Sequence, residues 1–249
     1  MTTFLNLCIS LTLVFLLNST VISQTISKKI SINKDLEIVS LTPNTYVHIS
    51  YADFAGFGRV ECNGMILRDG DEAFLFDTPP TELLTRTLVD WITQTLKLKI
   101  VGFIPNHWHS DCMGGLAYLQ SICVKSYANQ MTIEIARLKN LPVPTTGFKD
   151  SLSLKLGNTD ISCYYLGPGH SMDNIVIWIP TEKILFAGCL VKEISSKGLG
   201  NTVDGDLKAY PETIDKVLHK FKDAKIVIPG HGAYGGIELI RHTKELLKN

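Results

Sequence analysis

The stretch Pro105–Gly115 constrains this chain most, and it reads PNHWHSDCMGG. Three potential metal ligands, His107, His109 and Asp111, occupy alternate positions in it. Because alternate side chains of an extended backbone point the same way, His107 and His109 can bind one cation together. The apolar run at 100–104 predicts a buried strand immediately before them. The ligands therefore follow the carboxyl end of a strand, where open α/β sheets place their binding sites.

Three further candidates share this placement: His170, Cys189 and His231. Each follows an apolar run that predicts a strand, and each comes directly after a glycine. Glycine lets the backbone turn sharply and approach whatever is bound. A single buried cysteine or histidine is more often structural. Four strand ends that carry His, Asp or Cys indicate a metal site instead.

The six candidates divide into two sets of three. The first set offers neutral imidazole nitrogens, and the second carries two negative charges. The first set is His107, His109 and His170, and the second is Asp111, Cys189 and His231. Imidazole, thiolate and carboxylate ligands together suit zinc, and a catalytic zinc keeps three protein ligands and an open position. We therefore predict two Zn²⁺ per chain.

Residues 1–23 predict a cleaved secretory signal, with Gln24 as the first mature residue. This segment has no charged side chain, its apolar run 11–17 is too short to span a bilayer, and Val21 and Ser23 suit a signal peptidase site. A membrane anchor is the alternative interpretation. The 24 basic and 24 acidic groups leave no net charge, which argues against nucleic acid as the main partner.

Residues 24–249 show no linker or low-complexity tract and are predicted to form a single domain. Strand-like pairs come first in each half and helix-like segments later, which predicts two β-sheets packed face to face with helices outside. One helix is expected to begin with Thr78 as N-cap and Pro79 at its first position. The pairing of the cysteines Cys62, Cys112, Cys123 and Cys163 stays open.

The motifs HWHSD, GPGHS, AGCLVK, KGLGN and PGHG occur in the order and spacing of a known family. The chain resembles the class B metallo-β-lactamases, in particular the dinuclear-zinc subclass whose second site is Asp, Cys and His. The resemblance covers nearly all of the mature chain and implies an αββα sandwich of two mixed sheets. Thioesterases and nucleases of the same fold have Asp where this chain has Cys189, and a His ligand where it has Cys112, which is not counted as a ligand here.

The resemblance also implies functional roles. Lys192 is expected to hold the substrate carboxylate and Asn201 to lie near the lactam carbonyl, while Phe57 belongs to a flap that closes over the substrate. Asp111 is expected to act in catalysis, and Asp77 to be a buried acid behind the ligands. The implied protein is a periplasmic, monomeric, zinc-dependent hydrolase of penicillins, cephalosporins and carbapenems that confers antibiotic resistance. It needs no nucleic acid and no stable membrane association.

Two alternatives stay open. The first is another hydrolase of this fold, a thioesterase or lactonase, against which Cys189 and Lys192 argue. The second is a non-enzymatic zinc-binding protein, against which two sets of only three ligands argue, because structural zinc sites have four. The remaining histidines His48, His219 and His242 have no comparable setting and are predicted to be surface or packing residues. Trp108 is expected to point away from the ligand histidines and to pack.

Overall fold

The computed structural model describes residues 29–248 of the 249-residue chain. The predicted signal segment, residues 1–23, lies outside these described residues. Within 29–248, none of the helices combines the length and the apolar character needed to cross a bilayer.

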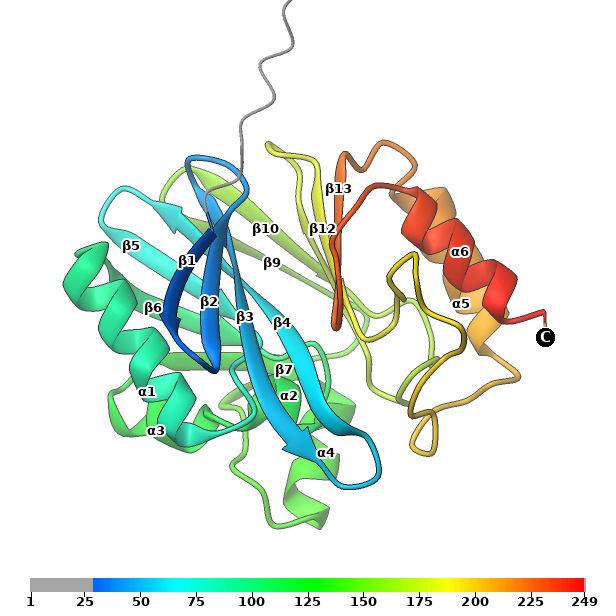
Figure 1. The fold of residues 1–249 in the computed structure, drawn as a ribbon, viewed down its shortest axis with the longest axis horizontal. Coiled ribbons are helices and arrows are strands. Elements are labelled where there is room, and N and C mark those ends of the chain that lie inside the picture. The colour runs from blue at the N-terminus through cyan, green and yellow to red at the C-terminus, as the bar shows by residue number, and fades with distance from the viewer. Residues whose placement is uncertain (1–28, 249) are drawn as a thin grey trace, which may run out of the picture.

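Eight strands form the larger sheet, and their spatial order follows their order along the chain (Figure 1). They are β1 (Lys29–Asn33), β2 (Leu36–Ser40), β3 (Thr45–Phe54), β4 (Gly58–Asp69), β5 (Glu72–Phe76), β6 (Lys99–Ile104), β7 (Lys125–Asn129) and β8 (Thr146–Phe148). Strands β1 to β5 pair antiparallel, whereas β5 to β8 pair parallel, so the sheet is mixed.

The smaller sheet has five strands in the order β13-β12-β11-β10-β9. They are β9 (Ser151–Leu156), β10 (Thr159–Tyr164), β11 (Val176–Ile179), β12 (Ile184–Gly188) and β13 (Ile226–Pro229). All neighbours pair antiparallel except β12 and β13, which pair parallel. This sheet is therefore mixed as well, as the resemblance implied.

The alternation of side chains along the strands builds the layers. On β4 and β5, Met65 and Phe76 face the smaller sheet and pack in one core with Phe186. Their neighbours Ile66 and Leu75 face the other way and pack under helices. Figure 1 shows α1 and α3 outside the larger sheet and α5 and α6 outside the smaller one. The predicted arrangement of two sheets between outer helices is therefore observed.

The helices within the described range vary in length. They are α1 (Glu82–Asp90), α2 (Ser110–Met113), α3 (Leu116–Ser121), α4 (Gln130–Leu138), α5 (Tyr210–Lys220) and α6 (Glu238–Leu246), and a π-helical turn, η1 (Trp91–Thr95), continues α1.

The predicted start of α1 was wrong. The helix begins at Glu82, and its N-cap is Thr81, whose side chain accepts a hydrogen bond from the backbone N–H of Leu84. Pro80 follows Pro79, and a residue that precedes a proline is disfavoured in helical geometry. The helix therefore starts only after both prolines. Thr78 instead donates its hydroxyl to the Cys112 carbonyl, which ties this turn to the ligand loop.

Candidate metal centre

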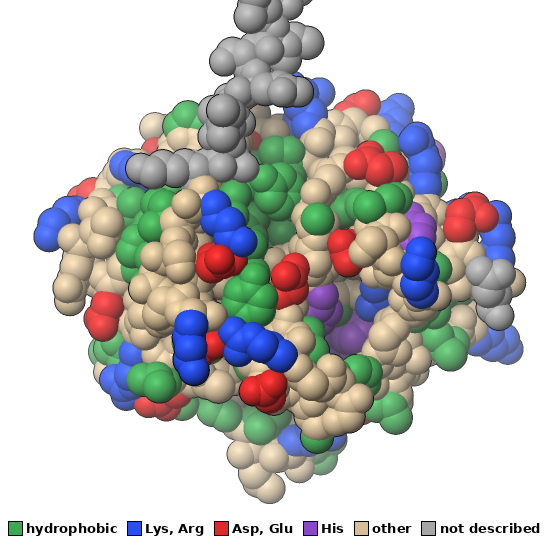
Figure 2. All heavy atoms as spheres, viewed as in Figure 1, with side chains coloured by type: hydrophobic (Ala, Val, Ile, Leu, Met, Phe, Trp, Pro, Cys, Tyr) green, Lys and Arg blue, Asp and Glu red, His purple; other side chains and the backbone are tan. Residues whose placement is uncertain are grey.

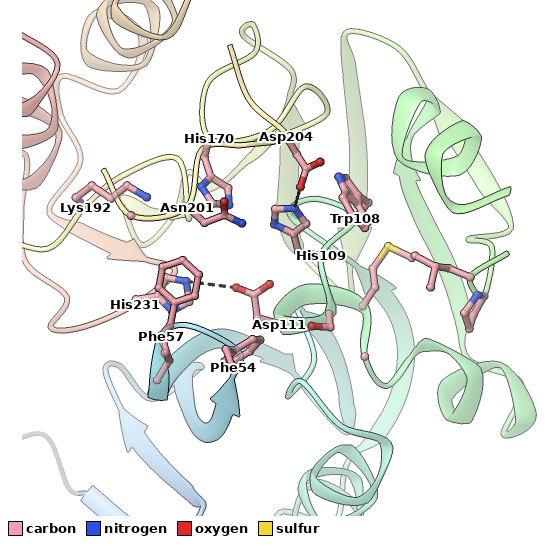
Figure 3. Close-up of a pocket in the computed structure, with 17 residues that line it drawn as sticks. Phe54, Phe57, Trp108, His109, Asp111, His170, Lys192, Asn201, Asp204 and His231 are labelled. Carbon is pink, nitrogen blue, oxygen red and sulfur yellow. Dashed lines mark hydrogen bonds and ion pairs between the residues drawn. The ribbon is translucent and has the colours of Figure 1, made fainter. Parts of the chain in front are cut away.

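Loops that follow four different strands bring the predicted ligands together. His107 and His109 follow β6, and Asp111 lies in α2, the short helix that comes next. His170 comes after β10, while Cys189 and His231 directly follow β12 and the end of β13. Figure 3 shows His109, Asp111, His170 and His231 pointing into one cavity.

The three histidines of the first set form a compact cluster. Nε2 of His107 lies 2.8 Å from Nδ1 of His109. The ring centroids of His107 and His170 are 4.8 Å apart, and those of His109 and His170 are 5.3 Å apart. All three rings meet nearly at right angles, so their nitrogens converge rather than stack.

In His107 and His109, one ring nitrogen contacts a neighbouring side chain, which shows that the other nitrogen is the one left to bind a metal. Sγ of Cys112 lies 3.2 Å from Nδ1 of His107, and Oδ2 of Asp204 lies 2.9 Å from Nε2 of His109. Metal-binding histidines commonly donate their second N–H to a partner in this way. Both ring nitrogens of His170 are buried and have no hydrogen-bond partner. A buried polar atom without a partner is costly, and a cation would satisfy it.

Burial keeps two rings of this cluster, those of His107 and His170, neutral. It lowers the pKa of His107 to about 3 and holds the pKa of His170 well below its usual range. Both rings are therefore uncharged at neutral pH and offer the lone pairs that a metal ion needs.

The second set has the spacing of a tetrahedral metal site. Sγ of Cys189 lies 3.5 Å from Oδ2 of Asp111 and 3.3 Å from Nε2 of His231, and these two atoms lie 3.3 Å from each other. Metal–ligand bonds of about 2.0–2.3 Å at tetrahedral angles require ligand atoms about 3.3–3.5 Å apart. The residues present therefore fit a zinc ion in both their chemistry and their spacing.

In the second set, Cys189, Asp111 and His231 shift one another's pKa through their charges and hydrogen bonds. A hydrogen bond from Cys112, helped by the charge of His231, lowers the pKa of Cys189 to about 6 although burial opposes this. Burial raises the pKa of Asp111, but its hydrogen bond with His231 and the neighbouring histidines lower it overall. Burial lowers the pKa of His231, but Cys189 and Asp111 together raise it well above its usual value. An imidazolium between two anions results.

The two sets are adjacent. Ligand atoms of His107, His170 and Cys189 all lie within 4.8 Å of one another, so Cys189 stands between the sets. A second group with the same limit contains Cys62, Asp111 and His231. The five cysteines of the described range are all free, which resolves the open question of their pairing.

Two further residues of this site, Cys62 and Asp204, were not predicted from the sequence. Asp204 lies three positions after Asn201, so its carboxylate in the same loop was a usable signal. Cys62 belongs to β4, and nothing in its local sequence indicates that β4 approaches the loop of His231.

A cavity of about 650 Å³ opens onto the ligands, and Figure 2 shows histidine side chains at the bottom of a hollow on this face. This volume is typical of small-molecule sites, which hold about 300–1,000 Å³. The apolar side chains of its wall are Phe54, Phe57, Val60, Trp108, Met113, Leu141 and Pro142. Phe57 stands at the tip of the β3–β4 hairpin between two glycines with positive φ, and 61% of it is exposed.

Lys192 and Asn201 line the same cavity. Lys192 is buried, and its ammonium donates to the carbonyl of Cys189 at 2.8 Å. Burial lowers the pKa of Lys192. Asn201 is exposed, and its Oδ1 accepts a hydrogen bond from the N–H of Val203, which leaves its amide NH₂ group on the cavity side (Figure 3).

Residues behind the ligands fix the loop. Asp77 is buried, and Oδ1 accepts a hydrogen bond from the backbone N–H of Asn106, next to His107. Asp77 is therefore the buried acid behind the ligands that the resemblance implied. His48 is buried against the Asp77 carbonyl and packs, as predicted. Trp108 packs under the Lys139 ammonium at 4.2 Å, as predicted. The prediction that it points away from the ligand histidines was wrong, because its ring centroid lies 4.4 Å from that of His109 and it lines the cavity.

The remaining two histidines lie away from the ligands. His219 is exposed on α5, and His242 on α6 contacts the Ser196 carbonyl at 3.0 Å. Both match the prediction of surface or packing residues.

Comparisons with known proteins agree with this geometry. The chain is 50% identical over 220 residues to the metallo-β-lactamase type 2 of Bacteroides fragilis, and the match covers 88% of each chain. It is 33% identical to the metallo-β-lactamase type 2 of Bacillus cereus, covering 98% of this chain and 97% of the relative. A solved metallo-β-lactamase from Pontibacter korlensis superposes with a TM-score of 0.83 at 34% identity, covering 86% of this chain and 99% of that chain. No protein-family model matches.

The fold, the donor set and these relatives together define a zinc-dependent hydrolase. The chain belongs to the metallo-β-lactamase family, and its αββα fold class is confirmed by the superposition.

Proposed function

We propose that this protein hydrolyses the amide bond of β-lactam antibiotics, namely penicillins, cephalosporins and carbapenems, and thereby confers resistance to them. One observation carries the proposal: two adjacent donor sets, one of neutral imidazoles and one with a thiolate and a carboxylate, share the floor of a cavity sized for a small molecule. The name shared by the relatives supports the same substrate class.

Two zinc ions fit these donor sets. His107, His109 and His170 would hold the first, and three ligands leave a position open. Asp111, Cys189 and His231 would hold the second beside it. The chemistry that zinc supplies in such a site is acidification of water and polarisation of a carbonyl group.

Asp111 is the residue of this chain best placed to move a proton. Its Oδ2 lies at the cavity floor, 3.3 Å from Nε2 of His231. From there it can accept a proton from the attacking water and deliver that proton to the amide nitrogen as the ring opens. That delivery matters because an unprotonated amide nitrogen is a poor leaving group.

Lys192, Asn201 and Phe57 position the substrate. Lys192 lines the cavity, and its ammonium charge matches the carboxylate that these antibiotics carry. The free amide NH₂ of Asn201 can donate to the lactam carbonyl oxygen where negative charge develops. Phe57 at the hairpin tip can cover the apolar substituents of the ring and exclude water.

The proposal includes export as a monomer, with residues 24–249 as one mature domain. The uncharged segment 1–23 supports it. N-terminal sequencing of the protein from the periplasm should begin at or near Gln24. Recovery of the full-length chain in the membrane fraction would contradict export.

The substrate class is tested with a panel assayed on one preparation. It contains a penicillin, a cephalosporin, a carbapenem, a thioester and a lactone. We expect hydrolysis of all three β-lactams and little turnover of the other two compounds. Turnover of the thioester or lactone alone would assign the chain to another activity of this fold.

A further inference from the structure

Cys62 is a buried thiol of β4 that has no place in either predicted set of ligands. Only 1% of it is exposed. Its Sγ and one ligand atom each of Asp111 and His231 all lie within 4.8 Å of one another. Asp111 and His231 therefore have a sulfur donor nearby in Cys62 as well as in Cys189.

Hydrogen bonds on both sides of Cys62 attach β4 to the loop that carries His231. The carbonyl of Glu61 accepts from Nδ1 of His231 at 2.7 Å. The backbone N–H of Asn63 donates to the Gly230 carbonyl at 2.8 Å, and its side-chain amide makes two further bonds to this loop. The residues on both sides of Cys62 are thus fixed to the segment that carries a ligand.

The same bonds define which atom of His231 is available. Because Nδ1 donates to the Glu61 carbonyl, Nε2 faces Asp111 and Cys189. A fourth donor must reach about 3.5 Å from the other ligand atoms to share their cation. The Cys62 sulfur lies within 4.8 Å of ligand atoms of Asp111 and His231, which exceeds this distance by little more than 1 Å, so a small shift of the side chain on cation binding would bring the sulfur into range of these two ligands.

On the basis of the two-metal function proposed above, we infer that Cys62 is a fourth protein ligand of the metal held by Asp111, Cys189 and His231. The donor set is then one carboxylate, one imidazole and two thiolates, and a coordinating thiol loses its proton to the solvent when the cation binds. Four protein ligands characterise tightly held zinc. The open position for water then belongs to the histidine set.

Cobalt substitution tests this inference directly, because each cobalt–thiolate bond adds to one charge-transfer band. The protein loaded with two Co²⁺ is compared with its Cys62→Ser, Cys189→Ser and double variants. Each single variant should lose about half of the band, and the double variant should lose all of it. Cys163→Ala is the matched control, because Cys163 is fully buried in the core between the sheets and should leave the band unchanged.

The outcomes separate this inference from the proposed function. A band that is unchanged in Cys62→Ser and absent in Cys189→Ser overturns the role of Cys62 and leaves the second metal site intact. A wild-type protein that binds two Co²⁺ without any thiolate band overturns the second donor set itself.

X-ray absorption at the zinc edge covers the case in which Cys62→Ser fails to fold. The wild-type protein loaded with two Zn²⁺ should show on average one sulfur neighbour per zinc at about 2.3 Å. Half a sulfur per zinc on average corresponds to Cys189 alone and would exclude Cys62 as a ligand.

Discussion

The histidine set and the second set, Asp111, Cys189 and His231 (the Asp111 set), share one cavity. They differ in whether their buried polar atoms have partners within the protein. In the histidine set, both ring nitrogens of His170 are buried without a partner. In the Asp111 set, Nε2 of His231 lies 3.3 Å from both Sγ of Cys189 and Oδ2 of Asp111. The raised pKa of His231 keeps its ring protonated, so its positive charge balances the negative charges of these two groups. A neutral donor set has no substitute for the metal, whereas a charged donor set can exchange the metal for a proton.

This difference predicts unequal dependence on zinc. Protons compete with the metal at the Asp111 set, because His231 must lose its proton before it can bind. His107 and His170 are already neutral, so the histidine set should retain its metal at lower pH. Four substitutions sharpen or break this contrast, and they follow in order of expected effect.

Replacement of His170 by alanine should have the largest effect. It removes one of the three nitrogen donors that hold the first zinc. Loss of a hydrogen-bond partner of a metal ligand already costs about 10–100-fold, so loss of the ligand itself should lower kcat/KM by more than about 100-fold. Zinc content by elemental analysis should fall by about one ion per chain. His48→Gln is the control, because His48 is equally buried but lies outside the ligand sets. Normal activity of His170→Ala would contradict the assignment.

Cys189→Ser should act mainly on the second metal. Serine is a weaker zinc donor than a thiolate, so the affinity for the second zinc should fall about 10–100-fold while the first is unchanged. Competition with a chromophoric chelator measures both affinities in one titration. An equal loss of affinity at both sets would show that they are not separate sites.

Asp204→Asn should weaken the histidine set by about tenfold, the low end of the range for such partners, because an amide oxygen still accepts from Nε2 of His109. The same chelator titration should show the loss in the first zinc alone. A loss confined to the second zinc would reverse the contrast between the two sets.

Lys192→Ala should have the smallest effect and should spare both metals. A contact made in both the ground and the transition state raises KM more than it lowers kcat, here by about fivefold to tenfold. Lys197→Ala serves as the control, because this lysine is exposed and lies outside the residues that line the cavity. Steady-state kinetics with a carbapenem measure kcat and KM of both variants. A lower kcat at constant KM in Lys192→Ala would exclude a role of Lys192 in substrate binding.

Local sequence patterns sufficed for most of the strands and for the positions of the ligands. An apolar run followed by glycine and a polar donor predicted the loops of His170, Cys189 and His231, because strand end and turn are both local properties. The edge strand β1 and the three-residue β8 were not predicted, since such strands depend on pairing with a neighbour.

Features of the site that depend on contacts between distant segments were also missed. Cys62 approaches His231 only because β4 bonds to a loop about 170 positions later in the chain, as the bond of Glu61 to His231 shows. The pattern of apolar and polar residues along β4 does not predict that contact. Asp204 reaches His109 across 95 positions.

In the proposed mechanism, the protein hydrolyses β-lactams through zinc held by the two donor sets. Carbapenem hydrolysis by the purified protein, followed before and after EDTA treatment and again after zinc is added back, tests it most directly. We expect EDTA to abolish hydrolysis, zinc to restore it, and a clavulanate-type agent that acylates serine to have no effect. Hydrolysis that persists after complete zinc removal, or that the acylating agent blocks, would contradict the roles assigned to all six ligands.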